Sequence, residues 1–255
     1  MPTDLVRLQH PEPIHVRTAD PVGLPFSKGI MATSLLATGM RTSEAYAIAS
    51  TVARSLIQRR ERSVESDELA DLAAEAIAVE VGFEHAERYR AWRAFRKTRR
   101  PFVVCLAGAS GVGKSTLATR LAVRFGIQRV VTTDAVRAVL RTVVPDAVLP
   151  ELHVSSYESS PASLQDDGDS FALQTRAVAS ATMAVAERAA AEGESLILEG
   201  VHLLPGAIRR RMQAAAPDAV VVERMLMLED PEIHGAQLRG RARKRPGRNG
   251  ARSLE

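Results

Sequence analysis

Apolar residues recur at helical spacing through most of the first hundred positions. The clearest example follows Ser66, where the apolar positions lie three or four residues apart: Leu69, Leu72, Ala73, Ala76 and Ile77. This spacing predicts an amphipathic helix that Ser66 caps and that ends near Gly82. A similar pattern at 43–57 and an aromatic-rich one before Pro101 predict two more helices. We therefore expect a mainly helical region from Pro25 to about Arg100.

The pattern changes after Pro101, which we interpret as the domain boundary. Short apolar runs, typical of strands buried on both faces of a parallel sheet, alternate there with helical stretches. The predicted strands are 102–107, 128–132, 195–198 and 219–228, and the predicted helices are 114–125, 134–142, 171–192 and 205–216. The sequence therefore predicts an irregular lead-in at 1–13, a small helical domain at 14–100, and an α/β domain at 101–255 whose parallel sheet has helices on both faces.

Composition indicates a folded chain in a reducing compartment. Of the 255 residues, 45% are hydrophobic, which is enough for a core. The single cysteine, Cys105, lies in an apolar run, so a disulfide framework is excluded and a core position is expected. No apolar run is long enough for a membrane span, and the first residues lack a signal-peptide pattern. The expected location is the cytoplasm, with no membrane partner.

The basic charge is concentrated in two clusters. The net charge is +4, and seven basic residues fall at 88–100 and seven at 239–252, with no acid in either segment. Such clusters are typical of a solvated helix face, of a polyanion-binding surface, or of an arm that closes over nucleotide phosphates. The three interpretations remain open at this point.

A phosphate-binding motif follows the first predicted strand of the α/β domain. Residues 108–115 fit G-x-x-x-x-G-K-[ST] and open a predicted helix. In such a loop, glycines let backbone N–H groups and the helix N-terminus surround phosphate. Lys114 is expected to hold the outer phosphates, Ser115 to ligate Mg²⁺, and Thr116 to contact an inner phosphate. The expected nucleotide contacts are Gly108, Ala109, Ser110, Gly111, Val112, Gly113, Lys114, Ser115 and Thr116.

Asp134 follows the second predicted strand of this domain and begins a helix. Ligands of open parallel sheets bind at the carboxyl ends of the strands, so Asp134 is a candidate to orient or deprotonate an acceptor hydroxyl. The alternative is that Asp134 caps its helix, and the two roles are compatible. Arg137, one turn further, is the first candidate cation for an anionic acceptor.

Two further features complete the predicted site. Glu199 ends the third strand, where P-loop proteins keep a carboxylate for magnesium or its waters, although a surface acid is the alternative. His202 is expected to be a hydrogen-bonded structural histidine rather than a catalytic one. A predicted helix after Pro231 carries a basic lid near 231–245, in which Arg239 and Arg243 are expected to enclose the transferred phosphoryl group.

Several blocks resemble the 2-phosphoglycerate kinases. They are the P-loop at 107–116, Thr133 to Arg137, Leu152 to Glu158, and 195–206, which reads SLILEGVHLLPG. The segment at 24–30, which reads LPFSKGI, and the helix near Tyr89 resemble the ATP-cone, a small helical nucleotide-binding module. The resemblance covers about 14–245.

The resemblance implies transfer of the ATP γ-phosphoryl group to the hydroxyl of 2-phosphoglycerate, which gives 2,3-bisphosphoglycerate and ADP. It implies ATP and Mg²⁺ at the P-loop, acceptor handling by Asp134, and substrate contact by Arg137 and the segment Ser155–Tyr157. A second, regulatory ATP is expected at the cone, with Lys28 and Arg17 as phosphate contacts; a helical cap without nucleotide is the alternative.

Family members continue beyond the basic lid with further helix and strand, whereas this chain stops at Glu255. A sheet without its last strand leaves an edge that a second copy of the chain, in a homo-oligomer, or the helical domain would cover. Two other functions stay open: a kinase of another small hydroxy acid or phosphorylated alcohol, and a non-catalytic relative that senses ATP or binds nucleic acid. Nucleic acid is not the expected partner, and steep salt dependence would distinguish it.

Overall fold

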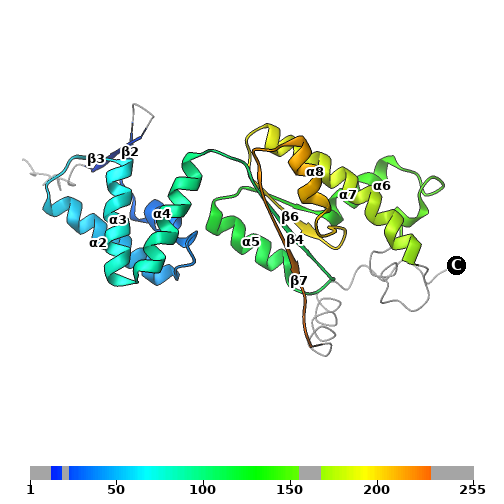
Figure 1. Ribbon diagram of the computed structural model, residues 1–255, viewed down its shortest axis with the longest axis horizontal. Helices are drawn as coiled ribbons and strands as arrows, with labels where there is room; N and C mark the ends of the chain where they lie inside the picture. Colours follow the sequence, from blue (N-terminus) through cyan, green and yellow to red (C-terminus); the bar gives the residue numbers. More distant parts are fainter. Residues whose placement is uncertain (1–12, 19–22, 155–167, 231–255) are drawn as a thin grey trace, which may run out of the picture. The chain divides into compact units, whose positions relative to one another are not determined.

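The computed structural model describes residues 13–18, 23–154 and 168–230 (Figure 1). The chain divides into two compact units, Met1–Thr98 and Arg99–Glu255. No helix within the described ranges is both long and apolar enough to cross a membrane.

The first unit combines helices with a small sheet. Its elements are β1 (His15–Arg17), β2 (Leu24–Pro25), α1 (Lys28–Leu36), α2 (Thr42–Gln58), β3 (Ser63–Glu65), α3 (Ser66–Glu80) and α4 (Phe83–Lys97). The strand order is β2-β1-β3, with β1 antiparallel to β2 and parallel to β3. The three strands are two or three residues long, too short to produce an alternating pattern, so the sequence predicted only the helices.

The helices of the first unit pack around one apolar core. The buried face of α3 includes Ala73, Ala74 and Ile77, in agreement with the predicted amphipathic pattern. The predicted cap of this helix was wrong, because Glu65 is the N-cap residue and Ser66 is the first helical residue. The hydroxyl and carbonyl oxygens of Ser66 instead accept hydrogen bonds from Arg93 Nη2, at 3.1 and 3.0 Å. Ser66 thereby joins α3 to α4.

The second unit is built on a parallel sheet. Its elements are β4 (Phe102–Gly108), α5 (Lys114–Phe125), β5 (Arg129–Thr132), α6 (Thr133–Val143), the 3₁₀ turn η1 (Pro150–Leu152), α7 (Gly168–Ala191), β6 (Leu196–Gly200), α8 (Ala207–Ala215) and β7 (Val220–Leu226). The described strands have the order β5-β6-β4-β7 and all pair in parallel. Because their carboxyl ends lie at one edge, residues after each strand meet there.

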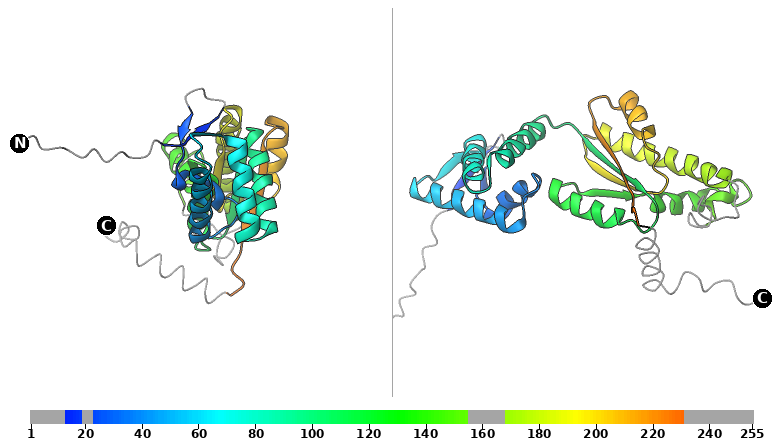
Figure 2. Two further views of the ribbon diagram at one scale, coloured as in Figure 1. Left: turned by 90° about the vertical axis from the view of Figure 1, so that its left-hand side faces the viewer. Right: turned by 60° about the horizontal axis from the view of Figure 1, so that its bottom comes forward.

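Helices cover both faces of this sheet, which confirms the predicted fold class (Figure 1, Figure 2). Alternate residues of β4 and β6 contact opposite layers: Cys105 and Leu198 pack toward α7 and α8, whereas Leu106 and Ile197 pack toward α5. Burial raises the pKa of the Cys105 thiol to about 12, with a smaller contribution from the Glu223 carboxylate. Cys105 is therefore an un-ionised core residue at neutral pH.

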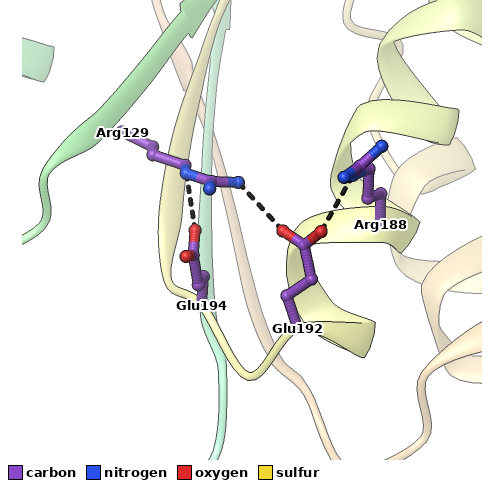
Figure 3. Close-up of polar contacts among 4 residues, drawn as sticks. All are labelled: Arg129, Arg188, Glu192 and Glu194. Carbon is purple, nitrogen blue, oxygen red and sulfur yellow. Dashed lines mark hydrogen bonds and ion pairs between the residues drawn. The ribbon is translucent and has the colours of Figure 1, made fainter.

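The outer strands of the described sheet are only partly buried, in contrast to the central pair, β4 and β6. Surface ion pairs hold the amino end of β5 in place (Figure 3). Arg129 Nε lies 2.5 Å from Glu194 Oε2, and Arg129 Nη1 lies 3.3 Å from Glu192 Oε2. Arg188 on α7 also pairs with Glu192, at 2.9 Å. This network joins β5 to the α7–β6 turn at the end of the sheet opposite the phosphate-binding loop.

Candidate functional site

An open cleft of about 670 Å³ lies at the carboxyl ends of the strands. The phosphate-binding loop and the first turns of α5 form one part of it. Thr132 at the end of β5, Glu199 and Gly200 at the end of β6, and Leu226 at the end of β7 form the remainder. The described lining is Ser110 to Leu117, Arg120, Thr132, Asp134, Glu199, Gly200, Val201 and Leu226. The fold thus brings the predicted loop, Asp134 and Glu199 to one cleft.

Glycines shape the phosphate-binding loop. Gly111 and Gly113 have φ angles of 89° and 94°, in the left-handed region that other residues rarely adopt. Gly108 has no room for a side chain, because a Cβ there would lie 2.4 Å from the carbonyl oxygen of Leu226. The loop can therefore approach a phosphate with its backbone N–H groups while it stays closely packed on β7.

Lys114 is the first residue of α5 and is only 6% exposed. Its Nζ donates a hydrogen bond to the carbonyl oxygen of Ala109, at 2.7 Å. This bond links Lys114, near the end of the loop, to Ala109, the second residue of the loop. The ammonium group is thereby held over the loop, at the cleft.

Ser115 and Glu199 come together although 84 residues separate them. The Ser115 hydroxyl donates to Glu199 Oε1 at 2.8 Å, and Glu199 is 5% exposed on β6. A hydroxyl and a carboxylate are the hard oxygen ligands that Mg²⁺ prefers, and such a site needs only one or two protein ligands when phosphates supply the others. The pair therefore fits a magnesium ion bound to a nucleotide.

Asp134 lies in the first turn of α6 and lines the cleft. It does not supply the cap of this helix: Thr132 is the N-cap residue, and its hydroxyl oxygen accepts from Ala135 N at 3.0 Å. The capping alternative for Asp134 was therefore wrong. Its exposed carboxylate is left to face the cleft at the positive end of α6.

Arg137 lies one turn beyond Asp134 on α6 but outside the lining of the cleft. Its guanidinium donates to the carbonyl oxygen of Val154, just after η1. Ser155 to Tyr157, which follow Val154, lie outside the described residues, as do Arg239 and Arg243 of the predicted lid. Lys28 is the first residue of α1 in the other unit.

His202 is fully buried and hydrogen bonded at both ring nitrogens. Nδ1 lies 2.9 Å from Thr133 Oγ1 and Nε2 lies 2.8 Å from Gln174 Oε1. Burial is the main reason that its pKa falls to about 4; Arg137 and Lys114 act in the same direction and Asp134 acts against them. The imidazole is therefore neutral at neutral pH, as the prediction of a structural histidine requires. Sequence reasoning missed Gln174, because a glutamine inside a long helix carries no motif.

Taken together, a parallel sheet, a glycine-rich loop that ends in Lys-Ser before a helix, and a strand-end carboxylate bonded to that serine define a P-loop nucleotide site of the kinase type. Sequence models of two families match the chain: the AAA domain at residues 103–253 and the ATP cone domain at residues 14–98.

Curated relatives are similar over most of the chain. The 2-phosphoglycerate kinase of Pyrococcus horikoshii is 38% identical over 200 residues, which are 76% of this chain and 66% of the relative. The enzyme of the same name from Pyrococcus furiosus is 40% identical over 74% of this chain and 64% of its own length. The enzyme of the same name from Methanocaldococcus jannaschii is 35% identical over 88% of this chain and 73% of its own length. The chain belongs to the 2-phosphoglycerate kinase family, and it spans about two thirds of the length of the relatives from the two Pyrococcus species.

Proposed function

We propose that this protein transfers the γ-phosphoryl group of ATP to the hydroxyl of 2-phosphoglycerate. The products are 2,3-bisphosphoglycerate, ADP and the proton released by the hydroxyl. The membership of the family and the joint placement of Lys114, Asp134 and Glu199 at one cleft support this assignment. The observation that carries it is the bond between Ser115 and Glu199, because it unites the two predicted magnesium ligands across the cleft.

On the nucleotide side, the loop residues 108–116 bind the phosphates through backbone N–H groups, and Lys114 contacts the outer phosphates. Ser115 and Glu199 are the residues that would hold Mg²⁺, which when bound supplies charge neutralisation to the phosphates. Arg239 and Arg243, in the basic lid, are proposed to enclose the γ-phosphoryl group.

On the acceptor side, Asp134 is proposed to accept the hydroxyl proton as the oxygen attacks phosphorus. An exposed carboxylate in the first turn of α6 is suited to this, since it lines the same cleft as the P-loop. Arg137 and the segment at 155–157 are proposed to contact the acceptor's own phosphate, for which a guanidinium fork is the best-matched donor.

The test is acceptor-dependent formation of ADP. Purified protein is incubated with ATP and Mg²⁺ and with a panel that contains 2-phosphoglycerate, 3-phosphoglycerate, glycerate and phosphorylated mevalonate-type alcohols. ADP that forms only with 2-phosphoglycerate supports the proposal, and preference for another member of the panel would reassign the acceptor. Binding of ATP without turnover of any acceptor would instead favour a non-catalytic relative, and salt-dependent binding of RNA or DNA would then be examined.

We expect Glu199→Gln to raise the Mg²⁺ concentration needed for half-maximal activity by about 10–100-fold, because a neutral amide replaces the charged oxygen ligand. The measurement is a magnesium titration of activity at saturating ATP. Glu194→Gln makes the same chemical change just before the opposite end of β6 and should leave the magnesium requirement unchanged. Equal magnesium curves for Glu199→Gln and the unmodified protein would exclude Glu199 from the metal site.

The ATP-cone match supports a second nucleotide site in the first unit. Lys28 begins α1 directly after its cap residue, Ser27, so its ammonium group adds to the positive end of that helix. We expect calorimetry to find two nucleotide sites and Lys28→Ala to remove one, with P-loop binding retained. A single site that Lys28→Ala leaves unchanged would make the first unit a helical cap without nucleotide.

A further inference from the structure

A chain of buried hydrogen bonds connects the end of β6 to α6, α7 and the segment after η1. His202, Thr133 and Gln174 are each fully buried, and none of them lines the cleft. His202 contacts Thr133 on one side and Gln174 on the other. Gln174 Nε2 in turn donates to the carbonyl oxygens of Glu151, at 2.5 Å, and Val154, at 3.2 Å. Four separate segments therefore meet at two side chains.

The direction of every bond in this chain is fixed by chemistry. Gln174 faces two carbonyl oxygens, which only accept, so its amide nitrogen must point to them and its oxygen must point to His202. His202 Nε2 must then carry the hydrogen that Gln174 Oε1 accepts. In the neutral imidazole, Nδ1 is left as an acceptor, and the Thr133 hydroxyl donates to it. The tautomer of His202 with its hydrogen on Nε2 therefore satisfies every hydrogen bond in this series.

These hydrogen bonds end next to the two residues proposed for the acceptor: Asp134, which lines the cleft, and Arg137, one turn further along α6. Val154 O accepts from Gln174 and also from Arg137, so the glutamine holds the carbonyl that orients the guanidinium. At the other end, Thr133 directly precedes Asp134. The Thr133 hydroxyl is packed against Gly200, where a Cβ would lie 1.8 Å from Thr133 Oγ1. The first turn of α6 is therefore fixed against the end of β6.

We propose that His202 and Gln174 are positioning residues that set Asp134 and Arg137 for the phosphorylated acceptor. This inference rests on the proposed function. The hydrogen bonds of His202 and Gln174 run to α6, to each other, and to the backbone of η1 and the segment after it. In the nucleotide loop, by contrast, the lysine is held by Ala109 and the serine by Glu199. The pair should therefore act on acceptor binding and transfer, and leave nucleotide binding unaffected.

The tautomer is tested by NMR on the full chain with ¹⁵N-labelled histidine. Long-range ¹H–¹⁵N spectra at neutral pH distinguish the two neutral tautomers from the imidazolium, and His202→Gln identifies the signal by its loss. The charged groups that act on this ring are Asp134 and Arg137 on α6 and Lys114 on α5. We expect a neutral ring with the hydrogen on Nε2. A hydrogen on Nδ1, or a doubly protonated ring, would contradict the proposed directions of these hydrogen bonds.

The positioning role is tested with Gln174→Glu, which keeps an acceptor for His202 but loses both donors. We expect the KM for the acceptor to rise, or kcat to fall, by about tenfold or more, while the KM for ATP changes less than about twofold. Gln213→Glu, on the exposed side of α8, is the control for the added charge and should change neither value. Parallel rises in both KM values, or no change in either, would contradict the proposal.

A second pair of variants covers the possibility that Gln174→Glu fails to fold. The amide nitrogen of His202→Gln can replace Nε2 as the donor to Gln174, whereas His202→Leu cannot, so the glutamine variant should keep more acceptor-dependent activity. Equal activity in the two, or loss of folding in all three variants, would assign the network to stability alone. If the unmodified protein binds ATP but phosphorylates no acceptor, the proposed function fails first. If it is active and Gln174→Glu behaves as the unmodified protein does, only the positioning role fails.

Discussion

Lys114→Met is expected to lower the rate of phosphoryl transfer by about 10²–10³-fold or more, the loss typical when one preorganised donor to developing charge is removed. Lys114 is 6% exposed and its ammonium group donates to Ala109 O at the cleft, so its position is set before ATP binds. Methionine keeps most of the side-chain volume and removes only the charge and its hydrogen bonds. The substitution should therefore affect catalysis far more than packing.

The measurement is ADP formation at saturating ATP and acceptor, with thermal unfolding as a check on the fold. Arg124→Met removes a positive charge from the last turn of the same helix, α5, and should keep near-normal activity. A Lys114→Met protein that keeps more than about a tenth of the normal rate would be incompatible with phosphate binding by this lysine in the transition state.

The sequence predicted the P-loop and its helix closely because all the information is local. Glycines at fixed offsets before Lys114 and Ser115 specify the turn, and the predicted helix at 114–125 has the bounds of α5. Glu199 was placed by a similar local rule, an acid at the end of an apolar run. Its bond to Ser115 follows from the pairing of β4 with β6, which puts both residues at one sheet edge.

Other parts of the site depend on tertiary packing that no local pattern encodes. Gln174 reaches His202 only because α7 packs over the end of β6, and Gly200 is required because Thr133 is packed against it. In the same way, Thr132 took the cap position of α6 that the sequence also allowed for Asp134. The small sheet of the first unit was missed because its strands are too short to show an alternating pattern, and because the pairing of β1 with β3 joins residues far apart in the sequence, such as Val16 and Val64.

The two roles proposed for the cleft depend on different tertiary contacts. The proposed nucleotide side consists of the loop, the start of α5 and Glu199 on β6, which are joined through Lys114 and Ser115. The proposed acceptor residues lie on α6, which Arg137 joins to Val154 after η1 and which Thr133 joins to His202 after β6. Substitutions on the two sides should therefore separate in their effects on ATP and on the acceptor.

Asp134→Asn is the clearest test of this separation. We expect kcat to fall by about 10²–10⁴-fold, the usual contribution of a positioned general base, with the KM for ATP little changed. Because Thr132 rather than Asp134 caps α6, the loss of the carboxylate should cost the helix only about 0.3–1 kcal/mol through its dipole. Lost activity would then report on chemistry instead of unfolding.

The control is Asp146→Asn, which makes the same change at an exposed position after α6 and should leave kcat unchanged. An Asp134→Asn protein with normal kcat would transfer the proton-accepting role elsewhere and leave Asp134 as an acceptor-orienting group only.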